Sequence, residues 1–141
     1  MYPLDDNWAF SVSVLAHRLS RRVAGVVGSC SALNLSQWRV LAAIADRPGL
    51  SASEVVALTP MDKGLVSRAV KHLVAASLLE RRASAQDARR AHLFLTDAGR
   101  AEYETIVDAL RAAGATGEGL PGAEALNRAV KAMIAAYAPD S

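Results

Sequence analysis

The sequence predicts a mainly α-helical (α+β) fold: a helix-turn-helix followed by a two-stranded β wing, with further helices at both ends of the chain. Between Ser51 and Thr96, two helix-forming segments are separated by a tight break, and two short apolar strands then flank a polar loop. Outside this stretch, apolar residues recur every three or four positions, as they do in amphipathic helices. The order of these elements favours one winged helix-turn-helix carrying extra terminal helices.

The first 50 residues predict two helices. Residues 6–27 carry an apolar seam with steps of three and four, formed by Trp8, Val12, Leu15, Leu19, Val23 and Val26. A loop over residues 28–34 should follow. Ser36 is expected to cap a second helix, which Pro48 and Gly49 end.

The helix-turn-helix begins at Ser51, which has Glu54 three residues later. This spacing is typical of a capping box, in which each side chain binds a backbone amide of the first turn. The helix should stop near Leu58, because Pro60 disfavours helical geometry in the residue before it. Thr59, Pro60 and Asp62 predict the start of the next helix.

The second helix of the pair has two distinct faces. Val66, Ala69, Val70 and Leu73 form an apolar stripe. The opposite face has two cations, a hydroxyl and no carboxylate, in the set Gly64, Ser67, Arg68, Lys71 and Ala75. Gly64 leaves room for a close approach to the backbone. An ordinary solvated surface helix is the alternative explanation for such a face.

The wing is predicted from two strands, residues 78–82 and 92–95, joined by a polar loop over residues 84–90. The loop contains Asp87, Arg89 and Arg90, and arginine on a flexible loop is suited to the minor groove of DNA. Residues 61–100 contain eight Lys and Arg against four Asp and Glu, a net charge of +4, whereas the whole chain is +2. Positive charge is therefore concentrated on the elements that would read a groove.

Two more helices should follow the wing. Thr96 is expected to cap a helix with Tyr103, Ile106, Val107 and Leu110 on one face. Glycines and a proline between residues 114 and 121 break the chain. A last helix is expected to follow, and the residues in line along it are Leu126, Val130, Met133 and Tyr137.

Several segments, in this order, closely resemble the MarR family of winged-helix transcription regulators. They are LSQWRVLAAIADRPGLSASEVV, MDKGLVSRAVKHLVAASLLERR and DARRAHLFLTDAGR, and they include the wing pattern Asp87-x-Arg89 and the junction Leu95-Thr96-x-x-Gly99. The resemblance covers roughly residues 8–137. It implies a dimer that binds DNA, most often as a repressor, and often a small aromatic or phenolic anion as effector.

The predicted organisation has three parts: residues 1–34 as an N-terminal dimerisation helix and loop, 35–96 as the DNA-binding core, and 97–141 as C-terminal dimerisation helices. A protein that reads a pseudo-palindromic operator must share its two-fold symmetry, so we expect a homodimer. A monomer that buries the terminal helices on its own core is the alternative. The side chains expected at the dimer interface are Trp8, Val12, Leu15, Leu19, Leu110, Leu126, Val130, Met133 and Tyr137.

Double-stranded DNA is the expected partner. The recognition helix and the wing should bring to it Lys63, Gly64, Ser67, Arg68, Lys71, Asp87, Arg89 and Arg90. Asp87 should hold Arg89 by a charge-assisted hydrogen bond. Ser36, Ser51 and Ser53, at helix starts, could present backbone amides to phosphates. An effector cleft, suggested by the resemblance alone, would be lined by Trp8, His17, Arg21, Trp38 and Tyr103.

Other functions find little support in the residues. No Ser/His/Asp set, P-loop or G-x-G-x-x-G motif is present, so no enzyme and no cofactor are expected. The three histidines lie on different elements, outside any metal-ligand spacing. Cys30 has no second cysteine with which to form a disulfide; an ordinary loop residue is favoured over a redox sensor. The chain has no basic, apolar leader and no membrane-length apolar run, which predicts a cytoplasmic protein.

One rival function stays open at this point. A winged helix can lose DNA binding and serve only as a protein-interaction module. A neutral or acidic recognition face would indicate such a module, and Arg68, Lys71, Arg89 and Arg90 argue against it.

Overall fold

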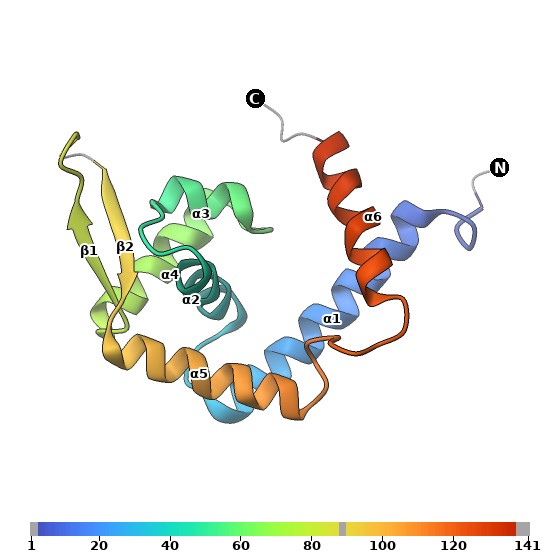
Figure 1. Cartoon of the computed structure of the whole chain (residues 1–141), viewed down its shortest axis with the longest axis horizontal. Coiled ribbons are helices and arrows are strands. Elements are labelled where there is room, and N and C mark those ends of the chain that lie inside the picture. The colour runs from blue at the N-terminus through green and yellow to red at the C-terminus, as the bar shows by residue number, and fades with distance from the viewer. Residues whose placement is uncertain (1–2, 88–89, 138–141) are drawn as a thin grey trace.

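The computed structural model describes residues 3–87 and 90–137. The fold is mainly α-helical with one two-stranded antiparallel sheet, as predicted (Figure 1). In chain order the elements are α1 (Trp8–Cys30), α2 (Leu35–Asp46), α3 (Ala52–Leu58), α4 (Lys63–Ala75), β1 (Leu79–Ala83), β2 (Ala91–Leu95), α5 (Asp97–Ala112) and α6 (Ala123–Ala136).

Figure 1 shows the hairpin beside α2, α3 and α4, while α5 runs beneath them toward α1. Helices α1 and α6 stand on the far side, and both described ends of the chain lie there. Among the described helices, none combines the length and apolar character that a membrane crossing requires.

The core joins all three predicted parts of the chain. Its centre is formed by fully buried residues such as Leu41, Ile44 and Leu73 from α2 and α4. Val27 of α1 and Ile106 of α5 belong to the same cluster and are also fully buried. The C-terminal end of α1 and the middle of α5 therefore fold as one body with the helix-turn-helix.

The start of α2 and the end of α1 differ from the prediction. Asn34, not Ser36, caps α2: its Oδ1 accepts from the Gln37 amide at 2.9 Å, and the Gln37 side chain accepts from the Asn34 amide at 3.0 Å. This reciprocal pair satisfies two amides, whereas Ser36 has Arg39 three residues later, which cannot accept a bond in return; this explains why the helix begins earlier. Helix α1 continues through Cys30, so the predicted loop over residues 28–34 shortens to 31–34.

The residues between α3 and α4 also have roles that differ from the prediction. Asp62 alone caps α4, accepting from the Leu65 amide at 2.8 Å. Thr59 instead ends α3, because its hydroxyl donates to the Val55 carbonyl at 2.8 Å. The predicted capping box of Ser51 and Glu54 and the predicted cap at Thr96 are both confirmed.

The hairpin is held to the helical core at two places. Gly49 donates to the Leu93 carbonyl and Leu93 donates to the Leu50 carbonyl, both at 2.9 Å. The His92 imidazole Nδ1 lies 2.7 Å from the Gly49 carbonyl oxygen. Gly49 has φ of +93°, which disfavours any residue with a side chain. These contacts fix the wing relative to the start of α3.

Candidate nucleic-acid interface

Helix α4 presents the face that the sequence assigned to DNA. Val66, Ala69, Val70 and Leu73 are buried, so the residues between them point outward. Lys63, Ser67, Arg68 and Lys71 are exposed, and α4 contains no Asp or Glu. The helix therefore offers three cations and a hydroxyl on one accessible side.

Gly64 has a local role that its sequence position did not reveal. A Cβ added at this glycine would lie 3.2 Å from Nη1 of Arg68 and 3.4 Å from Oδ1 of Asp62. The Arg68 guanidinium thus folds back over the first turn of α4, into the space that the missing side chain leaves. A residue larger than glycine would push this guanidinium outward.

The three helix-start serines lie in different settings. Ser36 is in the first turn of α2 and half-buried, and Ser53 is exposed in the first turn of α3. Ser51 is 5% exposed, and both of its polar groups bind Glu54: its amide donates to Glu54 Oε1 and its hydroxyl accepts from the Glu54 amide, each at 3.2 Å. A phosphate could reach the Ser51 amide only after Glu54 released it.

The hydrogen bonds from Ser51 lower the pKa of Glu54 below its ordinary value. The positive charge of Arg90 and the His92 ring act in the same direction. Glu54 therefore stays ionised at neutral pH, and it connects the start of α3 electrostatically to the base of the wing.

The wing loop is partly described. Arg90 is exposed, and its amide donates to the Asp87 carbonyl at 3.0 Å. The Gln86 amide donates to the Ser84 hydroxyl at 3.2 Å, which shapes the turn. Arg89, and with it the predicted bond from Asp87, lies outside the described residues.

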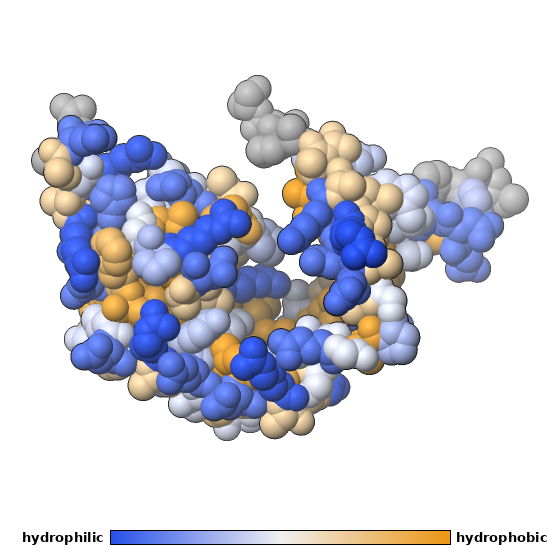
Figure 2. Space-filling view, in the orientation of Figure 1, coloured by the Kyte–Doolittle hydropathy of each residue, from blue (hydrophilic) through white to orange (hydrophobic). Residues whose placement is uncertain are grey.

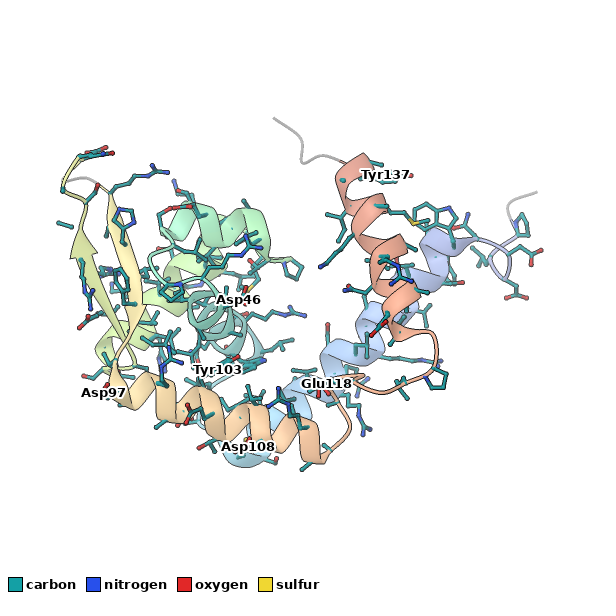
Figure 3. All side chains as sticks on the ribbon, viewed as in Figure 1. Asp46, Asp97, Tyr103, Asp108, Glu118 and Tyr137 are labelled. Carbon is teal, nitrogen blue, oxygen red and sulfur yellow. The ribbon has the colours of Figure 1, made fainter. Side chains whose placement is uncertain are left out.

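The five predicted effector residues fall into separate places. Trp38 of α2 and Tyr103 of α5 stack with ring centroids 5.6 Å apart and planes 20° apart; Figure 3 shows Tyr103 reaching from α5 toward α2. Trp8 instead meets Tyr137, edge to face, at 6.1 Å near the end of α6. His17 and Arg21 are exposed on α1 and belong to neither ring pair.

A small pocket of about 140 Å³ lies between α1 and α2, with Trp38 in its wall. Five lining residues lie outside the predicted effector set: Leu19, Ser20, Val23, Leu35 and Arg39. Arg39 donates to the Ser20 hydroxyl at 2.9 Å. Arg39 follows Trp38 directly in the sequence, and this adjacency could have indicated the pocket. A cation beside an aromatic side chain is suited to binding an aromatic anion.

Within the described residues, no three His, Cys, Asp or Glu side chains are grouped closely enough to hold a metal ion. Cys30 is half-buried at the end of α1, and its thiol lies 3.7 Å from the Val27 carbonyl oxygen. The arrangement consists of a basic helix face, a basic hairpin and a small pocket beside Trp38.

Comparison with known proteins identifies relatives of this chain. The sequence profile of the MarR family matches residues 33–90. TtmR, an HTH-type transcriptional regulator of Methylorubrum extorquens (strain PA1), is 30% identical over 97 residues, which are 69% of this chain and 49% of TtmR. The chain thus spans about half the length of the curated relative that it matches.

Two solved structures share the fold over almost the whole chain. A MarR family regulator from Silicibacter pomeroyi matches with a TM-score of 0.82 and 22% identity, covering 99% of this chain and 95% of that one. CouR from Rhodococcus jostii RHA1, solved with p-coumaroyl-CoA, matches with a TM-score of 0.79 and 20% identity, covering 100% and 99%. The repressor CouR has also been solved on a 23-mer DNA duplex. The chain belongs to the MarR family of transcription regulators.

Proposed function

We propose that the chain forms a homodimeric, sequence-specific DNA-binding transcription regulator, a ligand-responsive repressor that binds a pseudo-palindromic operator. The observation that carries this proposal is the exposed face of α4, with cations, a hydroxyl and no carboxylate, set beside a basic hairpin. The family supports it, as do TtmR and the CouR–DNA complex. Residues 35–96 would bind DNA.

In this proposal α4 lies in the major groove. Ser67 and Arg68 contact base edges, and Lys63 and Lys71 contact phosphates on either side. Gly64 allows the approach of the backbone, and Arg68 swings outward from its place over Gly64 to reach a base. The wing enters the minor groove with Arg89 and Arg90, and Asp87 orients Arg89. Ser36 and Ser53 contribute backbone amides to flanking phosphates, with Ser51 joining only if Glu54 releases its amide.

In the proposed dimer, the interface is formed by helices from the two terminal parts of the chain, residues 1–34 and 97–141. Helix α6 has no buried residue of its own, and Figure 2 shows beige and orange atoms on it beside blue, hydrophilic side chains. Its exposed apolar residues are Leu126, Met133 and Ile134, followed by Tyr137 just after the helix; those of α1 include Trp8, Val12, Leu15 and Leu19. An apolar helix face of this kind needs a cover, and a second copy supplies it with the required two-fold symmetry.

One predicted interface residue is buried within the chain itself. Leu110 is 6% exposed and packs in the chain's own core, so we do not expect its side chain to contact a partner. Val130 is half-buried on α6 and stays in the proposed interface.

We place the effector, a small aromatic or phenolic anion, beside Trp38 and Tyr103, with Arg39 as the nearby cation and His17 and Arg21 along α1. The chain has two tryptophans, and Trp8 lies apart with Tyr137. Trp8→Phe therefore leaves Trp38 as the only indole, and its fluorescence should respond to phenolic acids that release DNA. Unchanged emission in their presence would contradict this placement.

A binding titration tests the DNA proposal. Purified protein is titrated onto its own upstream DNA and onto a scrambled duplex at two salt concentrations. The proposal predicts tighter binding to the upstream fragment, two subunits per site and a steep loss of affinity with salt, because phosphate contacts release counterions. Absence of binding at low salt would refute DNA recognition and favour the interaction module.

A further inference from the structure

A second pocket, of about 230 Å³, opens where three elements of the proposed DNA-binding surface meet. The start of α3, the outer face of α4 and the base of the hairpin surround it. Its lining residues are Ser51, Ala52, Ser53, Ser67, Val70, Arg81, Arg90, Ala91 and Leu93.

The register of the hairpin explains why Arg81 faces this pocket. Arg81 pairs with Leu93, so the two side chains share one face of the sheet. Leu93 is 1% exposed and belongs to the core, which identifies that face as the inner one. Arg81 is exposed even so, because it extends past the core into the pocket.

The next residue faces the opposite way. Arg82 pairs with His92 on the outer face. Its Nε donates to Glu80 Oε1 at 2.9 Å, and its guanidinium carbon lies 4.1 Å from the centre of the Phe94 ring. The charge of Arg82 is thus balanced by a carboxylate, whereas Arg81 forms no ion pair with any described carboxylate.

The chemistry of the pocket suits one tetrahedral anion. Arg81 and Arg90 line it from the hairpin, and the exposed residues Ser53 and Ser67 line it from the helices, so guanidinium and hydroxyl donors are available at this place. No carboxylate lines it among the residues described. Glu54, near enough to interact with Arg90, is occupied by its bonds to Ser51.

The position of the pocket indicates which anion it would bind. A recognition helix in the major groove and a wing in the minor groove have one sugar-phosphate strand between them. We propose that this pocket holds one phosphodiester of that strand, with Arg81 as a phosphate-binding residue. The inference rests on the proposed DNA-binding function, and it assigns to DNA an arginine outside the recognition helix and the wing loop.

The test compares Arg81→Gln with Arg82→Gln, which removes the same charge from the other face of the same strand. We expect Arg81→Gln to weaken binding roughly tenfold or more, to a similar degree on operator and scrambled DNA, as loss of a charge-assisted contact should. The slope of log affinity against log salt should fall by about 0.9, the value for one phosphate. Arg82→Gln should change neither quantity. Arg81→Lys should retain most of the slope, and matching thermal unfolding curves check that each variant folds.

Four outcomes would overturn the inference. If Arg81→Gln kept the affinity and the salt slope of the wild type, Arg81 would not contact a phosphate, and the proposed DNA-binding function would still stand. Equal losses in both glutamine variants would indicate a general charge effect. If Arg81→Gln bound DNA normally but lost a thermal shift produced by inorganic phosphate, the pocket would belong to a free phosphate. Failure of the wild type to bind any DNA would refute the proposed function and this inference together.

Discussion

Replacement of Gly99 by alanine is a direct test of how the wing is joined to the rest of the molecule. Gly99 lies in the first turn of α5, and a Cβ at this position would be 2.0 Å from the Leu78 carbonyl oxygen and 2.9 Å from its carbon. Ordinary van der Waals contact begins at 3.4 Å, so the two atoms must part by 1.4 Å. The Leu78 oxygen belongs to the backbone and the Cβ is bonded directly to Cα, so neither atom can turn aside as the end of a flexible side chain can.

Moving Gly99 away from Leu78 would stretch or break the hydrogen bonds formed by Thr96. The Thr96 amide donates to the Leu78 carbonyl at 3.1 Å, and the Thr96 hydroxyl donates to the Ser77 carbonyl at 2.6 Å while accepting from the Gly99 amide at 3.0 Å. Overpacking costs about 1–3 kcal/mol, and each lost bond about 1 kcal/mol. Alanine is more favourable than glycine in a helix by about 1 kcal/mol, which offsets part of this cost. With two of these bonds lost, the net expected loss is about 2–4 kcal/mol of unfolding free energy.

Thermal and urea unfolding followed by circular dichroism measure this loss. A destabilisation of that size should lower the unfolding temperature by roughly 10 °C in a chain of this length. Gly25→Ala is the matched control, because nothing lies within 4 Å of its added Cβ on α1, and it should be neutral or stabilising by up to ~1 kcal/mol. A Gly99→Ala protein as stable as wild type would refute the geometry described for this junction.

Three further predictions concern DNA reading, pH and assembly. Ser67→Ala and Arg68→Ala should each lose about 1–3 kcal/mol of discrimination at particular base pairs, measured on a panel of operator variants; a uniform loss on every sequence would place these residues on phosphates. The pKa of Glu54 is depressed in the folded chain, so its stabilising effect is present at neutral pH and disappears as the pH falls through that folded-state pKa. An NMR titration should show this depressed pKa and its rise in Ser51→Ala, whereas an ordinary value in the wild type would contradict the capping geometry. Leu126→Glu should yield monomers in analytical ultracentrifugation, and Leu58→Glu, an equally exposed leucine outside the proposed interface, should not; dimers in both variants would contradict the interface.

Helix positions and faces could be predicted from sequence because short-range chemistry determines them. The Ser51–Glu54 box, the cap at Thr96 and the buried stripe of α4 depend on residues a few positions apart. The errors arose where two residues could each act as a cap. Ser36 and Thr59 are good capping residues by type, but Asn34 gained the reciprocal bond with Gln37, and the Thr59 hydroxyl bonded back into α3.

Long-range contacts could not be predicted in the same way. The bonds of Gly49 and Leu50 to Leu93 join segments more than 40 residues apart, and no local pattern announces them. The role of Gly99 also depends on a distant atom, the Leu78 carbonyl oxygen. Arg81 was counted in the basic charge of the wing but not assigned to a site, although the alternation of side chains along β1 places it on the inner face with Leu93.

Selection of binding sites from a random pool of duplexes is the most direct measurement of the central claim, that this chain is a dimeric reader of a defined DNA sequence. The selection is run at near-physiological salt, and the recovered sites are bound in full and as isolated halves. The account predicts a two-fold symmetric motif with half-site centres about one helical turn, ~34–36 Å, apart, and much weaker binding to one half. A pool without an enriched motif, or an enriched site without symmetry bound by one subunit, would contradict it.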